Sequence, residues 1–161
     1  MDRIFQRIID NDLSDLKGLI VDASVPVPQY LVNEIIEAAL RGNTNIDSCE
    51  ASIHEQNRVS VDLKTPRWPW PLNLKLRLYR SVDFTNSPKV RATLENNVLL
   101  GKLGSFFKAL PDGIRINGDQ IVVDLGHFLR TPEQRRILDL VRSVEIRTEE
   151  GRFIFDVTAR I

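Results

Sequence analysis

The sequence predicts an α+β fold in which a curved antiparallel β-sheet packs against helices and follows an N-terminal helical hairpin. Three observations lead to this prediction. Apolar residues recur at helical spacing before Gly42, and after it they alternate with a period of two over most of the chain. No stretch has the repeated strand–helix–strand order that a parallel sheet requires. We expect one domain over residues 1–161, with a helical section at 1–42 and an antiparallel sheet with two inserted helices at 43–161.

Two helices are expected in the first 42 residues. The first apolar stripe begins at Ile4 and extends to Ile20 with helical spacing. The second stripe runs from Leu31 to Leu40 and is preceded by Pro26 and Pro28, which hold the backbone extended or start a helix. Gly42 ends it. The two segments together predict a helical hairpin.

The period of two after Gly42 predicts several strands. A hairpin is expected over residues 49–63, with its turn near Gln56–Asn57. The run "LNLKLRLYR" is the clearest strand of the chain, because it carries leucine at every second position and polar residues between them. Further expected elements are a strand at 90–94, helices at Val98–Leu110 and Thr131–Arg142, and hairpins around Asn117-Gly118 and Gly151.

The composition excludes several classes of protein. Hydrophobic residues make up 42% and charged residues 27% of the chain, as in ordinary globular proteins. The single cysteine, Cys49, excludes an internal disulfide and a cysteine-cluster zinc site. No run of apolar residues is long enough to span a bilayer, and "MDRIFQRIIDND" does not resemble a signal peptide. We therefore expect a cytoplasmic protein without a cofactor.

Charge is unevenly distributed along the neutral chain. Residues 1–50 carry nine acidic and four basic side chains, whereas residues 51–110 carry four acidic and ten basic ones. The cationic middle third can attract an anionic surface over about 8 Å at physiological salt. Alternatively, the acidic first third folds against it and neutralises it. The sequence leaves both interpretations open.

Neither catalysis nor nucleic-acid binding is indicated. His54 and His127 are far apart in sequence, and neither lies in a nucleophile motif or at metal-ligand spacing. The glycines at 101 and 104 lie inside an apolar helical pattern and do not form a phosphate loop. One aromatic residue, Tyr79, lies on the basic face of the clearest strand, and the isoelectric point is about 6.7, so a nucleic-acid partner is not expected. We predict a protein that is not an enzyme.

The features that remain favour binding of an apolar or amphiphilic, lipid-like ligand, also at an anionic membrane surface. Tryptophan next to basic residues suits the headgroup level of a bilayer. The alternatives are that the leucine face and the 98–110 helix simply fill the core, and that the tryptophans cap the end of the sheet. The predicted ligand-binding residues are Trp68, Trp70, Leu72, Leu74, Leu76, Leu78, Leu103, Phe106 and Phe107, and the predicted contacts to an anionic surface are Arg67, Lys75, Arg77 and Arg80.

The runs "LPDGIRINGDQIVVDLGHFL" and "VRSVEIRTEEGRFIFDVTARI" resemble bacterial β-rich lipid-binding domains of the tubular-lipid-binding type. The resemblance covers about the last 100 residues and consists of hairpin patterns with a helix between them. It implies a groove between sheet and helix for an acyl or isoprenoid chain, and it implies no catalytic residues. The competing prediction is a protein-interaction or self-association module, such as a homodimer, that uses the basic sheet face or the RWPWP loop.

Overall fold

The structure is a computed structural model that describes residues 18–67, 69–84, 87–96, 110, 112–127 and 138–160. These residues form two antiparallel sheets and one long helix, α2 (Gln29–Leu40). The three-stranded sheet, in the order β1-β9-β8, consists of β1 (Ile20–Pro28), β8 (Val141–Glu149) and β9 (Arg152–Arg160). The six-stranded sheet, in the order β2-β3-β4-β5-β7-β6, consists of β2 (Ser48–His54), β3 (Arg58–Lys64), β4 (Leu72–Leu78), β5 (Lys89–Leu94), β6 (Ile114–Asn117) and β7 (Gln120–Asp124).

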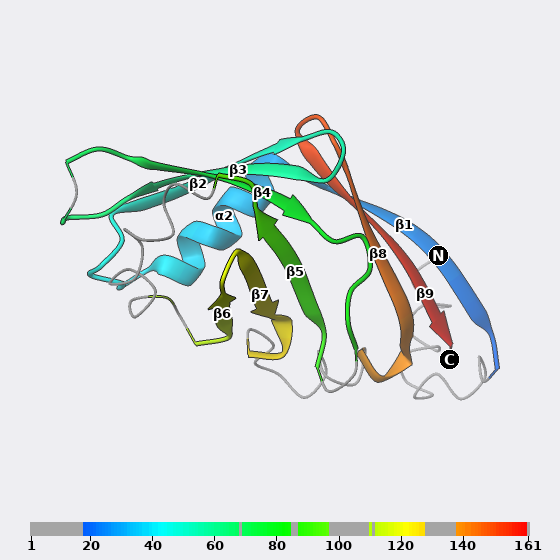
Figure 1. The fold of residues 1–161 in the computed structure, drawn as a ribbon. Helices are drawn as coiled ribbons and strands as arrows, with labels where there is room; N and C mark the ends of the chain where they lie inside the picture. Colours follow the sequence, from blue (N-terminus) through cyan, green and yellow to red (C-terminus); the bar gives the residue numbers. More distant parts are fainter. Residues whose placement is uncertain are drawn as a thin grey trace, which may run out of the picture.

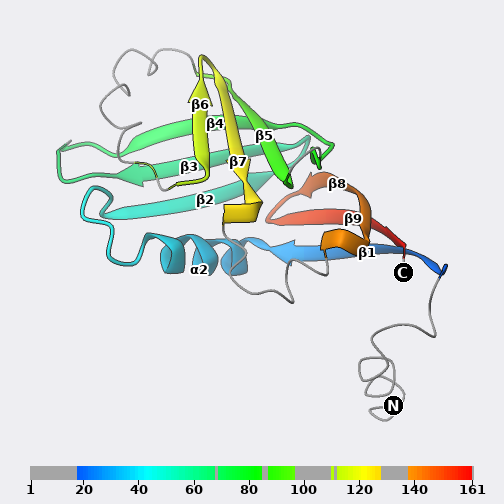
Figure 2. The ribbon, with the colours of Figure 1, turned by 90° about the horizontal axis from the view of Figure 1, so that it is seen from below.

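The strands form an arch with α2 beneath it (Figure 1). Seen from below, α2 runs along β2 and continues the line of β1, while β5, β6 and β7 cross in front of β2, β3 and β4 (Figure 2). A short 3-10 helix, η4 (Leu125–His127), follows β7. The inner side of the arch is thus bordered by α2 along one margin and by the β5–β7 strands across it.

The predicted α+β class with an N-terminal helical hairpin is wrong, because the described residues are mainly β-strands in two sheets. Ile20–Pro28, expected to join two helices, is strand β1 and pairs with β9 along its full length. Its sequence "IVDASVPVP" alternates apolar and polar or proline residues, and this period of two fits a strand at the edge of a sheet. The predicted helix from Ile4 lies outside the described residues, apart from its last positions.

Several local predictions are confirmed. Helix α2 begins directly after Pro28 and ends before Gly42, which has a positive φ of 86°. The 49–63 hairpin is β2–β3, and its turn residues Gln56 and Asn57 have φ of 60° and 57°. The helix expected at Val98–Leu110 lies outside the described residues except for its last residue. The same holds for most of the Thr131–Arg142 segment, whose last two residues belong to β8.

Two amide side chains of α2 close the outer edge of β2. Asn33 donates to the Ala51 carbonyl at 3.1 Å and accepts from the Ala51 amide at 2.8 Å. One helical turn earlier, Gln29 accepts from the Ile53 amide at 2.7 Å. An open edge strand offers unpaired backbone groups to other chains. Helix α2 satisfies these groups, although its own side chains are not deeply buried.

The two sheets are joined at β8. The Asn57 amide group donates to the Ile146 carbonyl at 3.0 Å and accepts from the Thr148 amide at 3.0 Å, as an adjacent strand would. The segment after β4 continues along the same edge, where Ser81 forms an antiparallel bridge with Glu145. The backbone of Val82 donates to Val144 at 3.0 Å. The junction therefore places the two sheets in one continuous arch.

Candidate apolar ligand-binding site

One face of the six-stranded sheet is apolar at every position. Residues paired across an antiparallel sheet point to the same side. The registers therefore gather one set of side chains on one side, and no polar residue interrupts it. This apolar face consists of Cys49, Ala51, Ile53, Val59, Val61, Leu63, Leu72, Leu74, Leu76, Leu78, Val90, Ala92, Leu94, Ile114, Ile116, Ile121 and Val123.

The apolar face continues onto the three-stranded sheet. The bridge between Ser81 and Glu145 puts these two polar residues on the same side, which leaves Val82 and Val144 on the other. The registers of β1, β9 and β8 then extend the apolar side over the second sheet. The extension consists of Val21, Ala23, Val25, Val27, Val141, Val144, Ile146, Phe153, Phe155, Val157 and Ala159, with Thr148 as its one hydroxyl-bearing member.

Only part of the apolar face is fully covered. Ile46, Leu63 and Leu72 form a buried cluster against which Leu40 of α2 packs, and Ile53 is the most deeply buried residue of the face. The apolar face is therefore the side turned toward α2, beneath the arch in Figure 1. Most other members are half-buried, and Val21 and Val25 of β1 are exposed. A surface of this extent that is neither packed shut nor polar is typical of a binding surface for apolar molecules.

The predicted leucines have unequal environments. Leu72 lies in the core cluster, whereas Leu74, Leu76 and Leu78 are half-buried on the same face. Trp70 is 76% exposed in the loop between β3 and β4. The structure thus brings the four leucines together and places Trp70 next to the end of their strand. The other predicted ligand-binding residues, Trp68, Leu103, Phe106 and Phe107, lie outside the described residues.

The predicted cationic contacts do not form one surface. Lys75 and Arg77 lie on the polar face of β4, opposite the leucines. The Arg77 guanidinium donates to Glu95 at 2.7 Å, and Arg80 donates to Glu145 at 2.8 Å. Arg67 lies in the β3–β4 loop and is exposed. Within the part of the chain that the structure describes, no carboxylate lies within ion-pairing distance of Arg67 or Lys75.

Thr65 is a residue that the sequence analysis did not single out. It follows β3 and is only 7% exposed, yet its hydroxyl has no hydrogen-bond partner among the residues that the structure describes. An unsatisfied buried hydroxyl costs about 1–3 kcal/mol. Thr65 continues the alternation of Val59, Val61 and Leu63, so the pattern could have placed it on the apolar face. The pattern could not have shown that its hydroxyl lacks a partner.

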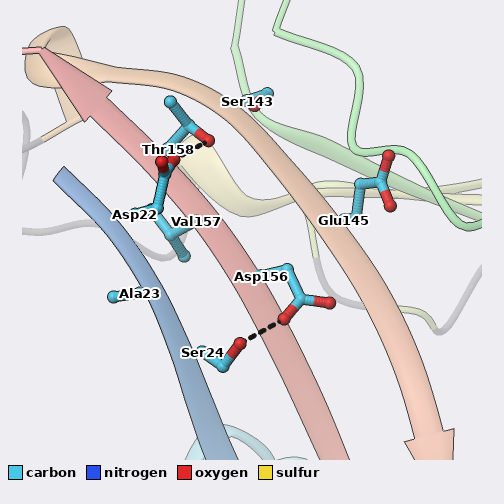
Figure 3. Close-up of a pocket in the computed structure, with 8 residues that line it drawn as sticks. All are labelled: Asp22, Ala23, Ser24, Ser143, Glu145, Asp156, Val157 and Thr158. Atoms are coloured by element: carbon cyan, nitrogen blue, oxygen red, sulfur yellow. Dashed lines mark hydrogen bonds between the residues drawn. The ribbon is translucent and has the colours of Figure 1, made fainter. Parts of the chain in front are cut away.

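The polar face of the three-stranded sheet carries a hollow whose lining side chains hydrogen-bond to one another. This hollow has a volume of about 340 Å³ (Figure 3). In it, Ser24 donates to Asp156 at 2.5 Å and Thr158 donates to Asp22 at 2.6 Å. The hydrogen bonds from Arg147 and then from Ser24 lower the pKa of Asp156 to about 2. These contacts tie strands β1, β8 and β9 together.

A second cleft, of about 820 Å³, lies between α2 and the start of β2. Its lining includes Glu34, Glu37 and Glu50, together with Cys49 of the apolar face. Burial, together with the nearby charge of Asp62, raises the pKa of the Cys49 thiol. Because the thiol form is favoured, Cys49 acts as a small apolar residue at this position.

The two histidines lie in separate places. His54 is within 3.2 Å of the Ser60 hydroxyl, and His127 lies 3.9 Å from Asp124. A bond from Ser87, the main cause, lowers the pKa of Asp124. In the described ranges, no group of three or more histidine, cysteine or acidic side chains could hold a metal ion. No helix in those ranges is long and apolar enough to cross a bilayer.

Comparisons with protein-family models, with curated proteins and with solved structures find no match to this chain. The functional argument therefore depends on the apolar face and on the residues at its ends.

Proposed function

We propose that this protein binds an amphiphilic, lipid-like molecule without catalysing a reaction, and that the apolar part of the ligand lies on the apolar face. The observation that supports the proposal most strongly is the uninterrupted run of apolar side chains across both sheets, most of which are half-buried. Burial of apolar surface contributes about 25 cal/mol per Å², so a long hydrocarbon chain on this face gains several kcal/mol. The resemblance to tubular-lipid-binding domains implies the same class of ligand.

Adjacent residues of β4 provide a matched test of this site. Leu76 lies half-buried on the apolar face, whereas its neighbour Lys75 points to the opposite, polar face. Leu76→Asn places an amide where the ligand chain would lie, and we expect affinity for diphenylhexatriene to fall about tenfold. Lys75→Asn should leave affinity within about twofold. Equal effects of the two variants, measured by fluorescence titration on folded protein, would contradict the proposed site.

Contact with an anionic membrane is a second part of the proposal, and the structure favours the β3–β4 loop for it. Arg67 and Trp70 are exposed in this loop, while Arg77 and Arg80 are engaged with carboxylates. We expect the protein to float with anionic vesicles at low salt and to dissociate at high salt, because screening weakens exposed charge contacts. Arg67→Ala should weaken flotation more than Arg80→Ala. A cytoplasmic location, which suits the unpaired Cys49, belongs to the same proposal.

Self-association is the second candidate function, and one observation favours it. Ile20 of β1 and Tyr30 and Ile35 of α2 are 60% or more exposed, on two elements that form one margin of the molecule. Exposed apolar side chains that lie along one margin are typical of an interface. Light scattering over a range of concentrations separates the two functions. A stable dimer that dissociates in the Ile35→Glu variant would favour self-association through this margin.

A further inference from the structure

Thr65 and Thr148 are the two buried polar residues of the described chain, and they differ in whether the hydroxyl has a hydrogen-bond partner. Thr148 is 8% exposed, and its hydroxyl accepts a hydrogen bond from the Asn57 amide at 2.6 Å. Thr65 is equally buried, but within the described ranges no atom of the chain hydrogen-bonds to its hydroxyl. Buried polar groups in native proteins nearly always have a partner, so an unpaired one indicates a partner that is not part of the chain.

The position of Thr65 indicates where that partner would come from. The residue follows Leu63, which belongs to the buried cluster at the end of the apolar face. Figure 1 shows the β3–β4 loop at the end of the six-stranded sheet that is remote from β1, β8 and β9. A ligand chain lying on the apolar face would have one of its ends at this loop. A polar atom at that end of the ligand would meet the Thr65 hydroxyl.

The charge beside Thr65 indicates the sign of the ligand's polar end. Arg67 follows Thr65 by two residues in the β3–β4 loop, and its side chain is exposed. Lys64 precedes Thr65 but lies on the polar face with Asp62. No carboxylate within the described residues pairs with Arg67. A hydroxyl that donates near an exposed guanidinium suits a carboxylate or phosphate oxygen.

We propose that the Thr65 hydroxyl donates a hydrogen bond to the anionic head of an amphiphile whose hydrocarbon chain lies on the apolar face. This inference rests on the proposed function and adds to it the polarity and location of the headgroup. Arg67 supplies the charge that compensates the head, and Trp70 belongs to the same loop.

The test compares three ligands on folded protein. Hexadecanoate and hexadecyl phosphate carry the two anionic heads, and diphenylhexatriene carries no polar atom. We expect Thr65→Val to reduce the affinity for at least one anionic ligand by about tenfold, because hydrogen bonds to charged groups are strong. Its affinity for diphenylhexatriene should stay within about twofold of wild type. Thr65→Ser, which keeps the hydroxyl, should retain most of the affinity.

Thr148→Val is the matched control, because it removes a buried hydroxyl that has a protein partner. We expect it to lower the melting temperature, whereas Thr65→Val should melt at or above the wild-type temperature. Should Thr65→Val fail to fold, or melt as low as Thr148→Val, the hydroxyl has a partner within the chain and the inference is wrong.

The remaining outcomes separate this inference from the proposed function. If wild type binds diphenylhexatriene but neither anionic ligand, the head site is refuted and the apolar site stands. The same conclusion follows if Thr65→Val binds the anionic ligands as tightly as wild type. If wild type binds none of the three ligands, both proposals are refuted together.

Discussion

The side chain of Asn57 links the two sheets at their junction. Its side-chain amide exchanges two hydrogen bonds with β8, and its carbonyl accepts from the Leu78 amide at 2.8 Å. Its φ of 57° lies in the left-handed region that asparagine tolerates better than most residues. The backbone conformation and the side-chain bonds thus both favour asparagine at the β2–β3 turn.

The first prediction isolates those side-chain bonds. Asn57→Gly keeps a residue that adopts positive φ but removes the amide group, so we expect the free energy of unfolding to fall by about 1–3 kcal/mol. Asn73→Ala is the control, since its bond to Asp62 at 2.7 Å joins two exposed side chains. Urea denaturation of both variants gives the comparison. Equal and small losses would mean that the junction does not depend on the Asn57 side chain.

The second prediction concerns Asp156 at low pH. Its folded-state pKa is about 2, below the ordinary value of 3.8, because Arg147 and Ser24 donate to the carboxylate. A lowered folded-state pKa adds stability that is complete above the unfolded pKa and is lost as the pH falls through 2. Asp156→Asn should therefore flatten the decline in stability between pH 4 and pH 2. Arg147→Gln should flatten it as well, because it removes the main cause.

The melting temperature, measured between pH 4 and pH 2, checks this prediction. If it declines equally in wild type, Asp156→Asn and Arg147→Gln, other carboxylates govern acid unfolding. This outcome would contradict the role given to the Arg147–Asp156 pair, whose Nε–Oδ2 distance is 2.6 Å.

At the residue scale, the sequence predicted which side chains share a face better than it predicted what each one does. The alternation of β4 correctly separates Leu72, Leu74, Leu76 and Leu78 from Lys75 and Arg77. It could not show that Arg77 is held by Glu95, because that contact joins residues 18 positions apart. It also could not show that the Thr65 hydroxyl is unpaired, because that depends on which atoms from other parts of the chain lie around it.

At the scale of elements, helix α2 acts mainly as a cover for the edge of β2. The third prediction tests this role. Asn33→Ala removes both hydrogen bonds to Ala51, so we expect the free energy of unfolding to fall by about 1–3 kcal/mol. We also expect the exposed edge of β2 to promote aggregation. Glu37→Ala, at an exposed position of the same helix, should change stability by less than about 0.5 kcal/mol.

Denaturation curves and light scattering measure the two effects separately. An Asn33→Ala protein as stable and as monodisperse as Glu37→Ala would show that the edge of β2 does not need this cover.

The elements that the sequence predicted correctly have strong local signals, and the one that it missed does not. Hairpin β2–β3 and strand β4 alternate clearly, and α2 is bounded by Pro28 and Gly42. At the start of β1, Leu19 and Ile20 prolong the helical stripe that begins at Ile4, and the prolines interrupt the period of two. What makes Ile20–Pro28 a strand is its pairing with Arg152–Arg160 at the far end of the chain, which no local pattern contains.

At the scale of the whole molecule, the central feature is that two sheets share one apolar side. The six-stranded and three-stranded sheets are joined by the Ser81–Glu145 bridge, by Asn57 and by the backbone of Gly151, whose amide donates to Ile53 at 2.9 Å. These contacts fix the relative orientation of the sheets, so the apolar residues of β1 and β9 continue those of β4. A ligand longer than one sheet can thus lie across both.

Native mass spectrometry of gently purified protein tests the central claim most directly. The account predicts a population heavier than the bare chain by the mass of one amphiphile, which organic solvent releases and which returns when hexadecanoate or hexadecyl phosphate is added. The opposite result would be the bare mass alone, before and after addition of either amphiphile or of diphenylhexatriene. That result would mean that the apolar face is closed to ligands.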